Sequence, residues 1–322
     1  MEKRKVIGIG ETVLDVIFKN DQPSAAVPGG STFNAMISLG RTAGVQFPDL
    51  DILMVTETGD EHIGDIIVDF MRRNHVSDSA VTRNRGTQSH ISMAFLDANN
   101  DAQYEFYKDH KHASLQADKV AIPQGFAAND LVLFGSFFAI NPVLRPYTSR
   151  LLQEAHEAGA LLYYDINFRK SHIPDIPDTL ENLQQNCRWS TIVRGSAEDF
   201  GYLFGTTDPS EIYERHIRPL CPYFICTDSH RPIWVFTPHF TLQIPVATIQ
   251  TVSTIGAGDN FNAGFLYGLL NQGITPSEFP TLTTTAWSEL VLLAQQFSKQ
   301  VCQSVYNYVD EGWKPDPLNP PA

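Results

Sequence analysis

A glycine-rich turn followed by a carboxylate, Gly256-Ala257-Gly258-Asp259, is the part of the sequence best suited to chemistry. Successive small residues let backbone N–H groups converge on an anion, and the positive end of a following helix adds to the attraction. Asp259 would lie in the first turn of that helix, where it could accept a proton from a substrate hydroxyl. This pattern fits phosphoryl transfer, whose loose transition state needs mainly positioning and charge stabilisation. A glycine turn capped by Asp, with no chemistry, would use the same residues.

A second glycine pair, Gly29-Gly30, also precedes a predicted helix. Two glycines permit close approach of a ligand, and Asn34 offers both a donor and an acceptor to a polyol. The alternative is a loop that ends in a Ser or Thr helix cap.

The two familiar nucleotide motifs are absent from the sequence. Gly8-x-Gly10 follows a predicted strand, but Val13 stands where the dinucleotide fingerprint requires glycine, and no P-loop sequence occurs. A nucleotide would therefore have to bind without a P-loop.

The composition limits the class of protein. The chain has 322 residues and a net charge of -13 without any basic run, which argues against nucleic-acid or anionic-membrane binding. Four cysteines without a C-x-x-C pair indicate a reduced, cytoplasmic protein. We expect no signal peptide, because the first apolar run is broken by Glu11 and Asp15. No uncharged apolar run reaches the roughly 18 residues of a membrane helix.

Short apolar segments alternate with longer helical ones, which predicts βαβ units and a mainly parallel sheet. The predicted strands are 5–11, 51–59, 130–138, 161–167, 189–195 and 223–229. The predicted helices are 32–44, 63–76, 143–160, 258–273 and, as one or two helices, 286–309. Segments 13–20 and 88–108 break this rhythm, and Asn99-Asn100-Asp101 is typical of a hairpin turn. We interpret them as a small β element separate from the main sheet.

Four stretches resemble, in order, the PfkB or ribokinase-like family of carbohydrate kinases. They are GIGETVLDVIF, PGGSTFNAMISLGRTAG, TETGDEHIGDIIVDFMRRNHV and TIGAGDNFNAGFLYGLL. The resemblance implies a ribokinase-like three-layer α/β/α fold with a mainly parallel central sheet. Residues 1–322 would form a single α/β domain, with a discontinuous β lid made approximately by 12–28 and 87–110. The pair of motifs favours phosphoryl transfer over the helix cap at Gly256–Asp259.

The resemblance also implies roles for individual residues. Asp259 would be the catalytic base, beside an anion hole formed by Gly256, Ala257 and Gly258. The sugar hydroxyls would be held by Asp15, Gly29, Gly30 and Asn34. The stretch YYDINFRKS is similar to a fructokinase-like D-x-N-x-R motif, which places Asn167 and Arg169 near sugar or phosphate.

The nucleotide half departs further from the family pattern. The residues implied to contact the nucleotide are Ser196, Thr227 and Gly258. Asp199 ends a Ser-Ala-Glu-Asp stretch at the place of the family's N-x-x-E, where it could order water bound to Mg²⁺. Ser253 replaces an Asp that helps to hold a monovalent cation in the family, which argues against potassium activation.

We therefore predict a cytoplasmic sugar kinase that uses ATP and Mg²⁺ to phosphorylate a hydroxyl of a small monosaccharide. The stretches DINFR and YEFYKDHKH favour fructose, with ribose, 2-keto-3-deoxygluconate or a nucleoside as alternatives. A second hypothesis is a sugar-binding or regulatory protein of the same fold with weakened catalysis. By analogy with the family, the lid would pair two copies into a homodimer.

Overall fold

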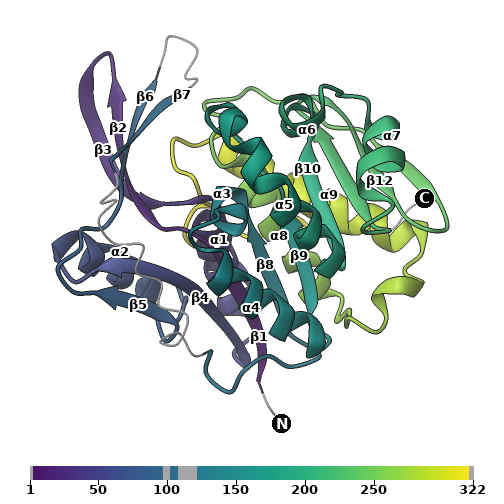
Figure 1. The fold of residues 1–322 in the computed structure, drawn as a ribbon, viewed down its shortest axis with the longest axis horizontal. Helices are drawn as coiled ribbons and strands as arrows, with labels where there is room; N and C mark the ends of the chain where they lie inside the picture. Colours follow the sequence, from purple (N-terminus) through teal and green to yellow (C-terminus); the bar gives the residue numbers. More distant parts are fainter. Residues whose placement is uncertain (1–2, 97–101, 108–121, 319–322) are drawn as a thin grey trace. The chain divides into compact units, whose positions relative to one another are not determined.

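The computed structural model describes residues 3–96, 102–107 and 122–318 (Figure 1). The chain folds as two compact units. Unit 1 comprises residues 1–125, 249–273 and 289–322, and unit 2 comprises 126–248 and 274–288. The predicted turn at 99–101, and residues 97–101 and 108–110 of the predicted lid, lie outside the described residues.

The strands of unit 1 form a parallel set and a separate small sheet. In the parallel set, β1 (Arg4–Ile9) pairs with β4 (Leu50–Gly59), which pairs with β5 (Val81–Asn84). The small sheet has the order β3 (Gln22–Gly29), β2 (Val13–Lys19), β6 (Ile91–Leu96) and β7 (Ala102–Tyr107). β2, β6 and β7 come from the two segments that break the rhythm of the sequence, as predicted, whereas β3 lies outside both. The small sheet is at the upper left of Figure 1.

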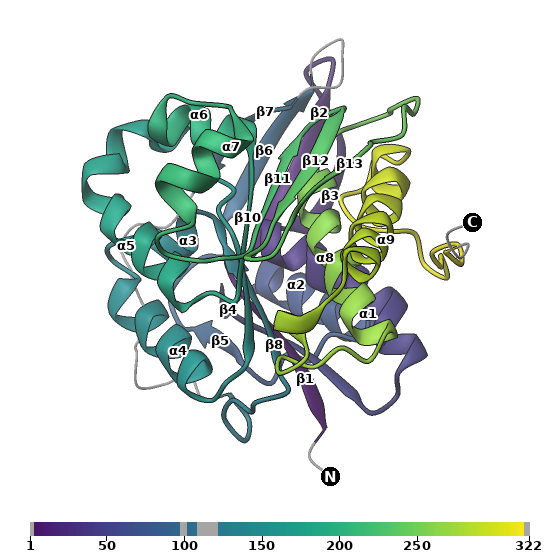
Figure 2. The same cartoon turned by 90° about the vertical axis from the view of Figure 1, so that its right-hand side faces the viewer.

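The helices of unit 1 are α1 (Ser31–Gln46), α2 (His62–Arg73), α8 (Ala257–Asn271) and most of α9 (Thr284–Cys302). Figure 2 shows α8 between α1 and α9. Every residue of α8 from Asp259 to Leu270 is buried, which agrees with the small or apolar residues of its last two turns, whereas the polar residues Asp259, Asn260 and Asn262 are at its start. Gly264 makes this packing possible, because a Cβ there would lie 2.7 Å from Ala294 Cα on α9.

Unit 2 has four parallel strands and an antiparallel extension. The parallel strands are β8 (Leu131–Gly135), β9 (Leu161–Asp165), β10 (Ile192–Ser196) and β11 (Phe224–Asp228). They are followed by β12 (Arg231–Phe236) and β13 (Thr241–Ile244). The helices are α3 (Ser136–Ile140), α4 (Arg145–Glu157), α5 (Ile176–Trp189), α6 (Ala197–Phe204) and α7 (Pro209–Ile212). Three short helical turns, η1 (Lys170–Asp175), η2 (Tyr213–Ile217) and η3 (Phe279–Thr281), complete the unit.

The predicted mainly parallel α/β class is confirmed, together with the separate small sheet. Several predicted elements are too long, and two of them show why. The strand predicted at 130–138 ends at Gly135, where the chain turns into α3 through Ser136 at φ 55°. The helix predicted at 286–309 ends at Cys302, and 303–309 is irregular. None of the helices in the described ranges is long and apolar enough to cross a membrane.

Candidate active site

The glycine turn predicted as an anion hole leads directly into α8. Gly256 caps the helix with φ 75°, and Ala257 and Gly258 are its first two residues. The helix ladder begins with Asn260, whose N–H donates to the Gly256 carbonyl at 2.9 Å. The N–H groups of Gly258 and Asp259 therefore lie before the ladder. An anion placed there would meet those N–H groups and the positive end of a 15-residue helix.

Asp259 is the third residue of α8 and is held by two side chains from α1. Ser31 Oγ donates to Asp259 Oδ1 at 2.8 Å, and Asn34 Nδ2 donates to Oδ2 at 2.9 Å. Ser31 and Asn34 reach the same carboxylate because residues three apart share one face of a helix. Each oxygen of the Asp259 carboxylate thus accepts a hydrogen bond from α1, and the two bonds together fix the orientation of the carboxylate.

Asp15 lies on β2 of the small sheet, where its side chain is 6% exposed. Its cross-strand neighbours are Val27 on β3 and Ser92 on β6. A Cβ at Gly29 would lie 2.1 Å from Asp15 Oδ2, so the carboxylate fills the space that the glycine leaves. Burial raises the pKa of Asp15 to about 7, the Ser92 hydroxyl acts to lower it, and the charge of Asp259 raises it further.

Asn307, in the irregular segment after α9, joins the surroundings of Asp15 to those of α8. Its Nδ2 donates to Asp15 Oδ2 at 3.3 Å, and its main-chain carbonyl accepts from Asn260 Nδ2 at 2.8 Å. Ser38 Oγ donates to Asn260 Oδ1 at 2.5 Å and accepts from the Val309 N–H at 3.1 Å. Unit 1 thus brings together two acidic side chains, a helix terminus and several amide and hydroxyl groups.

Asn167 and Arg169 lie in unit 2, in the loop that follows β9. Asn167 has φ 38°, and its Nδ2 donates to Ser136 Oγ at 2.9 Å. This bond connects the carboxyl ends of β9 and β8, which are parallel neighbours. Arg169 is exposed. Ligands of open α/β sheets bind beyond the carboxyl ends of the strands, where both residues lie.

Ser196 and Asp199 form a capping box at the start of α6. The Ser196 N–H donates to Asp199 Oδ2 at 2.6 Å, and the Asp199 N–H donates to Ser196 Oγ at 3.1 Å. The Phe168 N–H donates to the other oxygen, Oδ1, at 2.9 Å. Burial raises the pKa of Asp199 to about 6, while the Ser196 N–H acts to lower it. The capping box gives both residues a structural role, and their nucleotide and metal roles stay predictions.

Thr227, at the end of β11, belongs to a buried polar group with Arg194 on β10 and Asp165 on β9. Arg194 Nη1 lies 3.0 Å from Asp165 Oδ1, and Arg194 Nη2 donates to Thr227 Oγ1 at 2.7 Å. The side chains of Arg194 and Asp165 are 8% and 3% exposed. Because Thr227 accepts from Arg194, its hydroxyl proton remains available to a phosphate oxygen.

Ser253 precedes the glycine turn in unit 1. Its Oγ accepts from the Ile255 N–H at 3.2 Å, and its own N–H donates to the Cys302 carbonyl at 3.3 Å. The oxygen that Ser253 places here is neutral, whereas a hard cation prefers carboxylate and carbonyl oxygens. The argument against potassium activation stays a prediction on this basis.

The sequence model of the pfkB family carbohydrate kinases matches residues 3–310 of the chain. The chain belongs to the pfkB family of carbohydrate kinases. It is a phosphotransferase with a hydroxyl group as acceptor, and residues 256–259 lie within the matched range.

The curated relatives of this pfkB-family kinase include several fructokinases. Probable fructokinase-5 from Arabidopsis thaliana is 21% identical over 276 residues, which are 83% of each chain. Fructokinase-1 from Oryza sativa subsp. japonica is 24% identical over 275 residues, which are 81% of each chain.

Among solved structures, the fructokinase from Xylella fastidiosa with bound ATP has a TM-score of 0.78 at 18% identity, covering 94% of this chain and 93% of that chain. The aminoimidazole riboside kinase from Salmonella enterica, complexed with aminoimidazole riboside and an ATP analog, has a TM-score of 0.74 at 19% identity, covering 94% and 95%. These similarities show that the pfkB-family kinase shares their fold.

Three groups at the site were missed in the sequence. Ser31 had a usable signal, because it directly follows the glycine pair of the second motif. Arg194 had one as well, since a lone cation inside an apolar strand must find a buried partner. Asn307 had none, because the residues after Cys302 continue the apolar and polar pattern of α9 without a helix stop signal.

Proposed function

We propose that this pfkB-family kinase transfers the γ-phosphoryl group of ATP to a hydroxyl of fructose. The observation that carries the proposal is Asp259 in the first turn of α8, held by Ser31 and Asn34 behind a glycine turn. The fructokinases among its relatives and the stretch DINFR support fructose. Ribose, 2-keto-3-deoxygluconate and nucleosides are the alternatives, and the fold shared with a riboside kinase keeps them in the test.

In this mechanism Asp259 accepts the proton of the attacking hydroxyl. Ser31 and Asn34 hold the carboxylate in one orientation, so that no reorganisation is needed when the proton moves. Asp15 accepts a hydrogen bond from another sugar hydroxyl, and Asn307 keeps its carboxylate in place. The N–H groups at the start of α8 stabilise negative charge that develops on the transferred group.

The nucleotide contacts are proposed for unit 2. The Thr227 hydroxyl can donate to a phosphate oxygen while it accepts from Arg194. The oxygens of Asp199 each accept a main-chain N–H and keep lone pairs. This donor set fits contact with a metal through water rather than direct coordination. Mg²⁺, when bound, neutralises charge on the phosphates.

The small sheet is proposed as a lid over the sugar, because β2 carries Asp15. Closure of such a lid would exclude water, so that transfer to sugar outcompetes hydrolysis of ATP. We also propose a homodimer formed through the outer face of this sheet. Light scattering of the purified protein measures the mass and hence the number of copies.

The test is ADP release with Mg²⁺ and ATP on a panel of fructose, ribose, 2-keto-3-deoxygluconate and adenosine. Fructose should give the highest kcat/KM. Asp259→Asn should lower kcat by about 1,000-fold or more while sugar binding persists. Asp49→Asn, an exposed carboxylate on the loop before β4, is the matched control and should keep full activity. A higher kcat/KM for another sugar would reassign the substrate.

Absence of turnover on the whole panel, with measurable sugar binding, would favour the second hypothesis of a sugar-binding or regulatory protein. A potassium titration at constant ionic strength tests the Ser253 argument separately. Activity should change little, whereas strong activation would show that a cation site survives without the Asp. A Vibrio cholerae fructokinase, solved with fructose, ADP and a potassium ion, is the reference enzyme for this comparison.

A further inference from the structure

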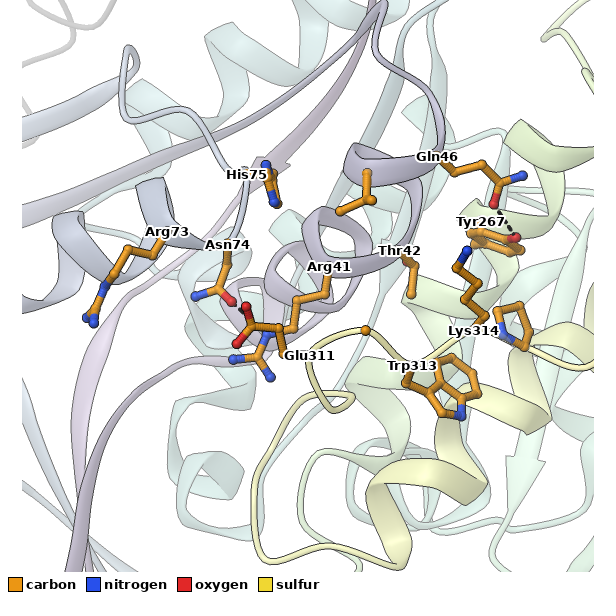
Figure 3. A pocket seen from close by; sticks show the side chains of 13 residues that line it. Arg41, Thr42, Gln46, Arg73, Asn74, His75, Tyr267, Glu311, Trp313 and Lys314 are labelled. Carbon is orange, nitrogen blue, oxygen red and sulfur yellow. Dashed lines mark hydrogen bonds between the residues drawn. The ribbon is translucent and has the colours of Figure 1, made fainter.

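Unit 1 contains a hollow at the C-terminal end of α1, the opposite end from the residues that contact Asp259 (Figure 3). It has a volume of about 350 Å³, within the size range of pockets that hold small molecules. Its walls come from the C-terminal ends of α1 and α2, from α8, and from residues 311–315. At 1.5 Å per residue, Arg41 and Gln46 lie roughly 10 and 18 Å further along α1 than Asn34. The pocket is therefore separate from the sugar site.

The charge of this pocket is opposite to that of the whole chain. Its lining includes Arg41, Arg73, Lys314 and His75, but only one acidic residue, Glu311. Glu311 lies beside Arg41 in Figure 3, and its negative charge favours the charged form of the Arg41 guanidinium. Neither Lys314 nor Arg73 makes an ion pair with any carboxylate in the described part of the chain. In a protein of net charge -13, this surplus of positive charge favours an anionic ligand.

The pocket also offers an ordered aromatic wall. Trp313 is half-buried and packs edge-on against Phe297, with ring centroids 4.9 Å apart at 84°. Tyr267 lies on the same lining and donates from its hydroxyl to Gln46 Oε1 at 2.7 Å. An aromatic face of this kind packs well against the apolar C–H face of a sugar ring. The lining thus combines a site for negative charge with a surface for an organic group.

Arg41 connects the pocket to the sugar site. Its Nη1 donates to the Val309 carbonyl at 2.6 Å, and its guanidinium lies 4.8 Å from the centre of the Tyr308 ring. Asn307, two residues before Val309, donates to Asp15. The segment from Asn307 to Lys314 therefore carries a donor for the sugar-binding carboxylate at one end and a pocket cation at the other.

We propose that this pocket binds a phosphate monoester of a sugar, and that its occupation changes sugar binding through residues 307–309. A phosphate group supplies a negative charge for Lys314, and the sugar ring packs on Trp313, which lies next to Lys314 in Figure 3. The ligand then adds an interaction to the segment that holds Asn307 against Asp15. The effect on sugar binding rests on the proposed function, whereas the binding site itself does not.

Calorimetric titration without nucleotide tests the binding site, with fructose 6-phosphate and inorganic phosphate as probes at constant ionic strength. Fructose 6-phosphate should bind the wild type more tightly than inorganic phosphate. Lys314→Glu should weaken this binding by about tenfold or more. Lys299→Glu, an exposed position on α9 outside the pocket lining, makes the same charge change and should leave it unaltered. Thermal unfolding of both variants establishes that they are folded.

Three results would overturn the binding site: no binding to the wild type, equal loss in both lysine variants, or no loss in Lys314→Glu. Equal affinity for the two probes would overturn a sugar phosphate in favour of free phosphate. Trp313 provides a second readout, since its fluorescence should change on binding and the change should vanish in Trp313→Phe.

The coupling is tested by kinetics with whichever sugar the enzyme phosphorylates. Fructose 6-phosphate that competes at the sugar site would raise the sugar KM equally in the wild type and in Lys314→Glu. An effect through the pocket should appear in the wild type and disappear in Lys314→Glu. Identical responses of the two proteins would refute the coupling. An enzyme inactive on every sugar would refute the proposed function, while the titration would still decide whether the pocket binds the ligand.

Discussion

Replacing Asp15 by Asn should stabilise the protein at alkaline pH while it weakens the sugar site. The Asp15 side chain is 6% exposed, and burial raises its pKa to about 7. Asn has nearly the same shape and keeps an oxygen that can accept from Asn307 Nδ2, but it carries no charge. The substitution therefore removes the cost of a buried anion with little change in packing.

The magnitude follows from the pKa difference between the folded and the unfolded chain. The pKa rises from 3.8 to about 7, a shift of about 3 units, and each unit corresponds to about 1.36 kcal/mol. Between these values the native state keeps a proton that the unfolded chain has released, so native stability falls as the pH rises. About 2 of these 3 pKa units lie between pH 5 and the folded-state pKa of about 7. The stability of Asp15→Asn relative to wild type should thus increase by about 3 kcal/mol between pH 5 and pH 8.5.

Urea unfolding at pH 5, 6, 7 and 8.5 measures this difference. The control is Asp49→Asn, which makes the same change of residue type at an exposed carboxylate. The sugar KM of Asp15→Asn should rise, since the variant has lost a charged acceptor for a sugar hydroxyl. A relative stability that is the same at pH 5 and pH 8.5 would refute the reasoning, because Asp15 would then titrate as an ordinary exposed carboxylate.

Three further substitutions test other contacts. Asn307→Leu removes a donor that favours the charged form of Asp15, the proposed sugar-binding carboxylate. The acid limb of the kcat/KM profile should therefore move to higher pH, and the sugar KM should rise about tenfold. An unchanged pH profile would contradict this role. Arg194→Met removes the guanidinium that lies 3.0 Å from the buried Asp165 carboxylate, so the free energy of unfolding should fall by about 3–5 kcal/mol in urea titrations, with recovery when Asp165→Leu is added. Gly256→Ala places a Cβ 2.9 Å from the Asn307 carbonyl oxygen, at a residue with φ 75°, so kcat should fall by about 10-fold or more. The control is Gly273→Ala, which has a similar φ of 66° but no atom within 4 Å of the added Cβ, and it should leave kcat unchanged.

The alternation of apolar and amphipathic segments was enough to predict the class of fold. Buried parallel strands such as β8 and β9 are continuous apolar runs, and that pattern survives without any knowledge of their neighbours. The antiparallel strands β12 and β13 were not predicted, because exposed polar residues interrupt their apolar pattern and Pro232 argues against a strand. The extent of β8 was overestimated because periodicity does not register the left-handed turn at Ser136.

The motifs predicted that Asp259 and Asn34 each lie near the start of a helix, and the structure places them there, joined by a hydrogen bond. What the sequence could not show is the set of contacts that hold these residues in place. The hydrogen bond from Asn307 to Asp15 depends on where α9 ends and how the chain then returns, which is decided by tertiary packing. The pocket beside Arg41 is likewise assembled from four separated segments. Three of them lie in stretches that resemble the family, but that resemblance did not indicate a pocket.

The hydrogen bond between Asn307 and Asp15 spans 292 positions of the sequence. During synthesis, a chain that has reached residue 302 already contains every strand and helix of unit 1, but it lacks the residue that holds Asp15. A contact of such long range costs more loop-closure entropy than a local one, which slows its formation. If Asp15 binds the sugar as proposed, its carboxylate gains this hydrogen bond only after residue 307 has been made, so a partly synthesised chain should bind sugar more weakly than the complete one.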